Sequence, residues 1–324
     1  MKVLIIKLGW SETLDPEVGK YPSLGDVVRT TPILHSFIDD DVTWLTDERA
    51  YPLLKDNPLI YRVLFFDLAT VLQLQAEQFD VVINLEKGPG LCALTNSINA
   101  YNKYGFRLDP ITGEVSAFIG SGDALEIYSD HAKKRESRLV WQDVLFEMIG
   151  RTWTGETYVL GYRPKSNVKY DVGLNFMVGS KWKNKEWPKQ NWNDLWDALR
   201  LSGYTVSNQD GSDDLEKYMD WINSCKLIVT HDSLGLHLAI ALGKKVIALF
   251  GGTPAHEVYL YEHGKKIVPE GFRCLPCLVP ECRNEVYCMS TITVDRVLSE
   301  IRGEINASGN AGGNIYRSVF NVPV

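Results

Sequence analysis

The sequence predicts an α/β protein made of two domains, each built on a parallel sheet. Short apolar runs rich in β-branched residues alternate with segments of helical periodicity, a pattern typical of βαβ units. The alternation stops over residues 152–166, where Gly155, Gly161 and Pro164 interrupt it, and it resumes at residue 172. A chain of 324 residues is long for one hydrophobic core and sufficient for two. We therefore expect the linker between the domains in this interval.

In the first half, each predicted strand is a short apolar run. These runs are Val3–Ile6, Val42–Leu45, Val63–Phe66 and Val81–Leu85. Apolar residues at helical spacing predict one helix over Asp26–Ile38, kinked at Pro32, and another over Arg138–Ile149. The intervening segment Trp10–Ser23 contains proline, glycine and serine, which predicts an exposed loop.

The second half repeats the alternation. Its predicted strands are Val172–Met177, Tyr204–Ser207, Lys226–Thr230 and Lys245–Phe250, and its predicted helices are Trp192–Leu199, Asp213–Asn223 and Leu236–Leu242. The last of these helices stops at Gly243, a residue typical of helix ends. We expect an N-terminal domain over residues 1–160, a C-terminal domain over 161–305, and a flexible Gly/Asn-rich tail over 306–324.

The composition narrows the class of protein. The net charge of −7 argues against a general nucleic-acid binder. No apolar run approaches the ~20 residues that a membrane span needs, so we expect at most peripheral membrane contact. The first residues continue as a strand rather than as a signal peptide, which favours a cytoplasmic location. Six cysteines are too few for a disulfide framework at this length.

The segment Lys226–Thr253 is the central unit of the second half. It combines a buried strand, a tight polar turn over residues 231–235, a helix and a second buried strand. The turn joins the carboxyl end of a strand to the amino end of a helix, where α/β proteins bind phosphates. A simpler reading is that Asp232 and Ser233 only cap the helix, and the two roles are compatible.

Three stretches, in order, resemble a known family. They are KVLIIKLG followed by LGDVVRTTPIL, KEWPKQNWNDL at residues 185–195, and THDSLGLHLAIALGKKVIALFGGTP at residues 230–254. Together they resemble glycosyltransferase family 9, the ADP-heptose:lipopolysaccharide heptosyltransferases. The resemblance implies a GT-B fold, with two Rossmann-like domains facing each other across a cleft. It also implies a nucleotide-sugar donor on the C-terminal domain, an acceptor on the N-terminal one, and inverting transfer without a catalytic metal.

Two positions depart from the family pattern. The segment Trp10–Ser23 separates the first strand from the Gly–Asp pair, where the family has only a few residues, and it is a candidate acceptor flap. In the third stretch Leu234 stands where the family has glycine, and Gly235 follows it, although the spacing from Asp232 to His237 is kept. A side chain at 234 is expected to affect how closely a diphosphate approaches the backbone.

The resemblance assigns the proton-accepting role to Asp26, which would deprotonate the acceptor hydroxyl. The alternative is an ordinary carboxylate in the first turn of a helix, worth ~0.3–1 kcal/mol through the helix dipole. Arg29 lies one helical turn later and is expected to face the same cleft, where it would meet an acidic acceptor.

The same resemblance places donor contacts in the second half. Lys185 matches the lysine that meets the donor phosphates, although Lys181, Lys183, Lys185 and Lys189 also read as a solvated basic run. Ser233 and the amides of Leu234, Gly235 and Leu236 would hold the leaving diphosphate. Further candidates are Asp232 for the loop or the donor sugar, His237 for a phosphate, and Thr253 for a phosphate or the ribose.

Four cysteines form a separate cluster. Cys274, Cys277, Cys282 and Cys288 follow the pattern C-x2-C-x4-C-x5-C, and four thiolates so close in sequence are candidate ligands for a structural zinc or iron ion. Some autotransporter heptosyltransferases that resemble this family carry cysteine-bound iron. The alternative is a set of reduced, partly buried thiols. No catalytic role is expected for these residues.

The resemblance thus implies an inverting glycosyltransferase that needs no cofactor for catalysis. It would move a heptose or related sugar from a nucleotide diphosphate, with ADP-heptose as the expected donor, to a hydroxyl of a lipopolysaccharide-core-type or other surface-glycan acceptor. The acceptor class spans glycans, glycolipids and proteins, so a protein O-heptosyltransferase of the autotransporter type is one alternative. Others are a nucleotide-sugar-binding protein without transfer activity and a GT-B epimerase or phosphorylase-like enzyme.

Overall fold

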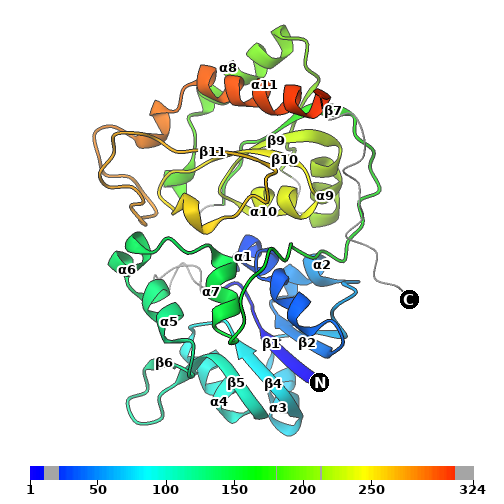
Figure 1. The fold of residues 1–324 in the computed structure, drawn as a ribbon, viewed down its shortest axis with the longest axis vertical. Coiled ribbons are helices and arrows are strands. Elements are labelled where there is room, and N and C mark those ends of the chain that lie inside the picture. The colour runs from blue at the N-terminus through cyan, green and yellow to red at the C-terminus, as the bar shows by residue number, and fades with distance from the viewer. Residues whose placement is uncertain (11–21, 180, 212–213, 311–324) are drawn as a thin grey trace.

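The fold was determined as a computed structural model that describes residues 1–10, 22–179, 181–211 and 214–310. It contains two sheets with helices on their faces, stacked along the long axis of the molecule (Figure 1). We call the part built on β1–β6 the N-terminal lobe and the part built on β7–β11 the C-terminal lobe. Two α/β units, each with a largely parallel sheet, confirm the predicted fold class.

The sheet of the N-terminal lobe has the strand order β3-β2-β1-β4-β5-β6. The strands are β1 (Lys2–Ile6), β2 (Asp41–Thr46), β3 (Arg62–Phe65), β4 (Gln78–Asn84), β5 (Asn99–Leu108) and β6 (Val115–Ala117). Strand β1 lies in the centre, paired in parallel with β2 and β4, and its residues 3–6 are fully buried because helices cover both faces. β6 pairs antiparallel with β5, and the apolar runs of the sequence predict neither of them.

The helices of the N-terminal lobe are short. They are α1 (Leu24–Val28), η2 (Thr31–Phe37), η3 (Glu48–Ala50), α2 (Tyr51–Leu54), α3 (Leu68–Ala76), α4 (Pro89–Ser97), α5 (Gly122–Ser129), α6 (His131–Glu136) and α7 (Trp141–Glu147). The single kinked helix predicted over Asp26–Ile38 is wrong. Helix α1 ends at Val28, and a separate 3₁₀ helix begins at Thr31 with Pro32 in its first turn. Proline has no backbone N–H, but a residue in the first turn of a helix makes no helical hydrogen bond through that group, so none is lost. Most of the predicted loop Trp10–Ser23, at residues 11–21, lies outside the described residues.

The sheet of the C-terminal lobe is fully parallel, in the order β11-β10-β9-β7-β8. Its strands are β7 (Tyr170–Asn175), β8 (Val206–Asn208), β9 (Cys225–His231), β10 (Lys245–Leu249) and β11 (Gly264–Ile267). Its helices are η4 (Lys183–Lys185), α8 (Lys189–Leu201), α9 (Leu215–Asn223), α10 (Leu234–Ala241), η5 (Ala255–Glu257), η6 (Cys288–Thr291) and α11 (Val294–Asn310).

Two ends of these helices bear on the sequence predictions. Helix α10 begins at Leu234, two residues earlier than predicted, and Gly243 follows its end with φ +64°, a conformation that favours glycine. Helix α11 continues to Asn310, so the flexible tail predicted from residue 306 begins too early, and residues 311–324 lie outside the described chain.

Within the described ranges, no helix combines the length and the apolar character that crossing a membrane requires.

The two lobes meet where α1 faces α10 (Figure 1). Val28 and Leu53 of the N-terminal lobe belong to the same apolar cluster as Leu236 and other core residues of the C-terminal lobe. Gly25 packs closely against α10, because a Cβ there would lie 2.8 Å from His237 Cδ2. This contact brings the carboxyl ends of β1 and β9 to one interface, the edge at which parallel α/β sheets bind ligands.

We predict that Gly25→Ala destabilises the protein by about 1–3 kcal/mol, because the added methyl overpacks the contact between α1 and α10. The apparent midpoint of urea unfolding measures the change. Gly122→Ala in α5 is the matched control, since nothing lies within 4 Å of a Cβ at that position. Equal midpoints for the two variants would contradict the close packing of the lobes.

Candidate active site between the lobes

A cleft between the lobes collects most of the residues predicted from the sequence. Residues of both lobes line it. The predicted residues among them are Asp26, Lys185, Asp232, Ser233, Leu234, His237 and Thr253. Asp26 and Ser233, which belong to opposite lobes, therefore share one crevice. Gly235 is not among the lining residues, and a Cβ there would run into the side chains of Asn175 and Tyr218.

Asp26 lies in the first turn of α1 with only 7% of its surface exposed. Its Oδ2 is 2.6 Å from Lys7 Nζ, and its Oδ1 accepts a hydrogen bond from Arg29 Nε at 2.8 Å. Burial alone would raise the pKa of Asp26, but the two cations outweigh it and hold the pKa well below its usual range. Asp26 is therefore ionised and faces the cleft.

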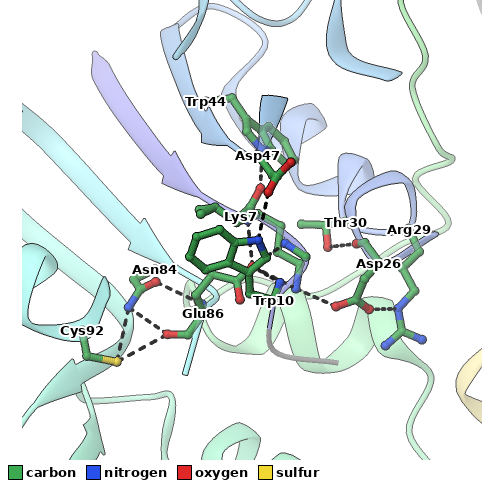
Figure 2. Close-up of polar contacts among 12 residues, drawn as sticks. Lys7, Trp10, Asp26, Arg29, Thr30, Trp44, Asp47, Asn84, Glu86 and Cys92 are labelled. Atoms are coloured by element: carbon green, nitrogen blue, oxygen red, sulfur yellow. Dashed lines mark hydrogen bonds and ion pairs between the residues drawn. The ribbon is translucent and has the colours of Figure 1, made fainter. Parts of the chain in front are cut away.

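Lys7 is held between two carboxylates at the end of β1 (Figure 2). It is 1% exposed, and its Nζ also lies 3.6 Å from Glu86 Oε1. Burial would lower the pKa of Lys7, whereas Asp26 and Glu86 raise it, and the net shift is upward. The lysine thus keeps its charge in the interior.

Glu86 follows the end of β4 and is the second carboxylate beside Lys7. Its Oε1 accepts hydrogen bonds from the backbone N–H groups of Leu8 and Gly9 at 2.7 and 2.6 Å. Asn84 fixes the turn that carries Glu86, since its side chain accepts from Glu86 N and donates to Glu86 O (Figure 2). The ends of β1 and β4 are therefore joined through the glutamate that also faces Lys7.

Lys185 and Asp232 form the corresponding ion pair in the C-terminal lobe. Lys185 Nζ lies 2.9 Å from Asp232 Oδ2 and 3.0 Å from Asp232 O, and Thr253 Oγ1 donates to the same Oδ2 at 2.6 Å. Burial would raise the pKa of Asp232, but Lys185 lowers it below its usual range. Lys185 is only 6% exposed, whereas Lys183 is about two-thirds exposed and pairs with Glu281. The basic run is thus not uniformly solvated.

His237 lies on α10 where the two lobes touch. It is 5% exposed, and its Nδ1 is 3.3 Å from the hydroxyl of Tyr158. Burial lowers the pKa of His237 to about 4, so the ring is neutral at neutral pH. It can act as a hydrogen-bonding group, but it adds no positive charge to the cleft.

Ser233 is the N-cap residue of α10, although its side chain makes no capping hydrogen bond. Its Oγ lies 3.4 Å from Asn175 Nδ2. The amino end of α10 therefore reaches the cleft with Ser233 and Leu234 beside it, and its amides carry the partial positive charge of a helix start.

Cationic side chains outnumber carboxylates in the lining of the cleft, although the whole chain is acidic. The cations are Lys7, Arg29, Lys87, Lys134, Lys181 and Lys185, and the carboxylates are Asp26, Asp130, Asp232 and Glu257. Burial, together with the nearby Lys134 and Lys7, lowers the pKa of Lys87 to about 8. A concentration of positive charge in a partly desolvated cleft favours anionic ligands such as a diphosphate.

The four clustered cysteines lie in a second pocket, around the loop that precedes η6. Asn184 and Asn284 donate from their side-chain amides to the Sγ atoms of Cys277 and Cys274, each at 3.5 Å. Burial, with the other three thiols, raises the pKa of Cys288 to about 11. Throughout the described ranges, no set of three or more His, Cys, Asp or Glu side chains is arranged to hold a metal ion.

The sequence reasoning did not identify Lys7, Glu86 and Glu257 as members of the site. Lys7 and Glu257 line the cleft, and Glu86 supports it. A signal for two of them was available, because Lys7 and Glu86 are charged residues that directly follow apolar strand sequences, VLII and VVINL. Charged groups at the carboxyl ends of central parallel strands lie at the ligand-binding edge of the sheet.

Comparison with known proteins finds similar sequences and similar folds. The model of "Glycosyltransferase family 9 (heptosyltransferase)" matches residues 211–288. The chain is 22% identical to lipopolysaccharide heptosyltransferase 1 of Campylobacter coli, an alignment that covers 93% of this chain and 98% of the relative.

Two solved structures share the fold over 95% of this chain. One is E. coli ADP-heptose lps heptosyltransferase II, with a TM-score of 0.63 at 15% identity and 100% of that chain covered. The other is the iron-containing dodecameric glycosyltransferase TibC of enterotoxigenic E. coli H10407, with a TM-score of 0.58 at 12% identity and 77% of that chain covered. The two structures confirm the predicted GT-B fold. The comparisons as a whole confirm the resemblance to glycosyltransferase family 9 that the three sequence motifs predict, and with it an enzyme that transfers a sugar.

Proposed function

We propose that this protein transfers a heptose or a closely related sugar, with inversion, from ADP-heptose to a hydroxyl group of a lipopolysaccharide-core-type acceptor on the cytoplasmic side of the membrane. The observation that carries the proposal is that Asp26 and the Lys185–Asp232 pair face one cleft from opposite lobes. The carboxylate can accept the proton that the acceptor hydroxyl loses during glycosyl transfer. The cation and the helix amides can stabilise the negative charge that develops on the leaving diphosphate. The similar proteins named above, which include heptosyltransferases, support the sugar and the nucleotide.

Asp26 is suited to accept the proton of the acceptor hydroxyl. Its ion pairs with Lys7 and Arg29 make it a weak base in the resting protein. A weak base takes the proton late, after the acceptor oxygen has begun to bond to the sugar carbon and has become more acidic. The same cations fix the carboxylate in one orientation, which favours attack from one face of the sugar.

The C-terminal lobe is suited to hold the leaving diphosphate. Lys185 supplies a buried positive charge, and the amino end of α10 supplies backbone N–H groups beside Ser233. Preorganised donors of this kind stabilise a developing phosphate charge strongly, because they need not reorient during the reaction. In this proposal Asp232 and Thr253 position Lys185 rather than the sugar.

A test of the function uses purified protein, ADP-heptose and a core acceptor that lacks heptose. Release of ADP together with a heptosylated acceptor supports the proposal. ADP-heptose binding without transfer to any acceptor would instead favour a nucleotide-sugar-binding protein. Transfer to a protein but not to the core acceptor would favour the second candidate, a protein O-heptosyltransferase. Two observations support this candidate: the cysteine cluster and the likeness to an iron-containing glycosyltransferase.

We predict that Asp26→Asn lowers kcat by about 10²–10⁴-fold, since the amide cannot accept the proton. The affinity for ADP, measured by calorimetry, should stay unchanged because Asp26 belongs to the opposite lobe. Asp39→Asn is the control, an exposed aspartate outside the cleft. Transfer at the wild-type rate in the Asp26 variant would remove the base assignment.

We predict the reverse pattern for Lys185→Met. Loss of a charge-assisted contact to the diphosphate should weaken ADP binding by about 10–100-fold. Lys183→Met, at the exposed end of the same run, should bind ADP normally, and Lys185→Arg should recover part of the affinity. Equal ADP affinities in the two methionine variants would show that Lys185 does not contact the donor.

The cysteine cluster remains a separate prediction. The four cysteines line one pocket, and we assign no catalytic step to them. If they hold a structural zinc or iron ion, metal analysis of the purified protein should find about one equivalent per chain, and Cys277→Ser should lose it. A metal-free protein with four titratable thiols would establish the alternative of reduced cysteines.

A further inference from the structure

Glu257 is a buried carboxylate of the C-terminal lobe whose charge is balanced by the N-terminal lobe. It ends η5, shortly after the loop that carries Thr253, and it is 4% exposed. Its Oε2 lies 3.9 Å from Arg29 Nη1, and its Oε1 lies 3.6 Å from Lys134 Nζ. Both cations belong to the opposite lobe.

Burial makes this arrangement sensitive to the contact between the lobes. An ionised carboxylate in the interior needs nearby opposite charge, because it has lost its hydration. Glu257 Oε1 also lacks a hydrogen-bond partner among the described residues, so the cations across the interface provide its compensation. Separating the lobes would remove both cations from Glu257 at once.

Arg29 connects Glu257 to the candidate base. Its Nε donates to Asp26 Oδ1 at 2.8 Å while its Nη1 faces Glu257, so one planar guanidinium contacts both carboxylates. The same group lies 4.8 Å from the centre of the Trp141 ring, which limits its rotation. A change in the position or charge of Glu257 would therefore act on Asp26 through the Arg29 guanidinium.

We propose that Glu257 is a positioning residue for the transfer reaction. From the C-terminal lobe it orients Arg29, and Arg29 orients Asp26, so the base is aligned only while the lobes are in contact. The proposal rests on the proposed function in that it takes Asp26 as the base. It ties proton removal to the state in which the two lobes are in contact. Contact between lobes is also how such enzymes exclude water during the reaction.

The test compares Glu257→Gln with Glu281→Gln, a control at an exposed ion pair on the same lobe. The amide keeps the shape of Glu257 but loses its charge, and we expect kcat to fall about 10–100-fold because the base is misaligned. The KM for the donor and the Kd for ADP should stay within about twofold of wild type. Glu257→Asp, which keeps the charge, should recover part of kcat.

A direct contact between Glu257 and the sugar predicts a different result. It would raise the KM for the donor in Glu257→Gln without changing the Kd for ADP, and that outcome overturns the proposal. An unchanged kcat overturns it as well.

A double-mutant cycle tests whether Glu257 acts through Arg29. If it does, Glu257→Gln should lower kcat little further in a protein that already carries Arg29→Gln, since the link is broken in both cases. Fully additive losses would mean that Glu257 acts by another route and would overturn the proposal.

Failure of the proposed function can be told apart from failure of this inference. A wild-type protein that releases no ADP with any acceptor contradicts the proposed function. The link across the interface is then measured by hydrogen exchange of residues 24–30, which should exchange several-fold faster in Glu257→Gln than in Glu281→Gln. Equal exchange in the two variants would overturn the link itself.

Discussion

The buried charge cluster around Lys7 is the constraint on which the N-terminal side of the site depends. A lysine that is 1% exposed is tolerable only because Asp26 and Glu86 surround it, and removing one partner of such a pair typically costs about 3–5 kcal/mol. The three residues come from the end of β1, the start of α1 and the end of β4. Their electrostatic balance therefore fixes the relative position of these three elements. The candidate base is oriented by the same interactions that stabilise the lobe.

The C-terminal lobe also contains a buried lysine whose charge is neutralised by a carboxylate. Lys185 and Asp232 neutralise each other beside the amino end of α10, as Lys7 and Asp26 do beside α1. Arg29 and Glu257 connect the two halves, because their ion pair crosses the interface. Contact between the lobes thus brings the two charge clusters into one cleft.

The sequence was most informative where local pattern and burial agree. Apolar, β-branched runs predicted the central strands because those strands are covered on both faces, whereas β5 contains many polar residues and forms through pairing with β4 and β6. Asp26, Lys185 and Ser233 were found from motif resemblance. Glu257 could not be found, because its significance lies in contacts with Arg29 and Lys134, more than a hundred positions away in the sequence. Lys7 and Glu86 each carry a local signal, a charge directly after an apolar run, but their proximity depends on the pairing of β1 with β4, which the local pattern does not specify.

The start of α10 has leucine at 234 and glycine at 235, and packing within and between the lobes restricts both positions. Gly235 is required where it stands, since a Cβ would collide with Asn175 and Tyr218. Leu234 lines the cleft at the point where Gly25 of α1 approaches the backbone of α10, since a Cβ at 25 would come within 3.4 Å of Leu234 Cα. The absence of a side chain at 25 thus lets α1 pack closely against the start of α10. The amino end of α10 therefore lies at the cleft with glycine required at 235 and leucine tolerated at 234.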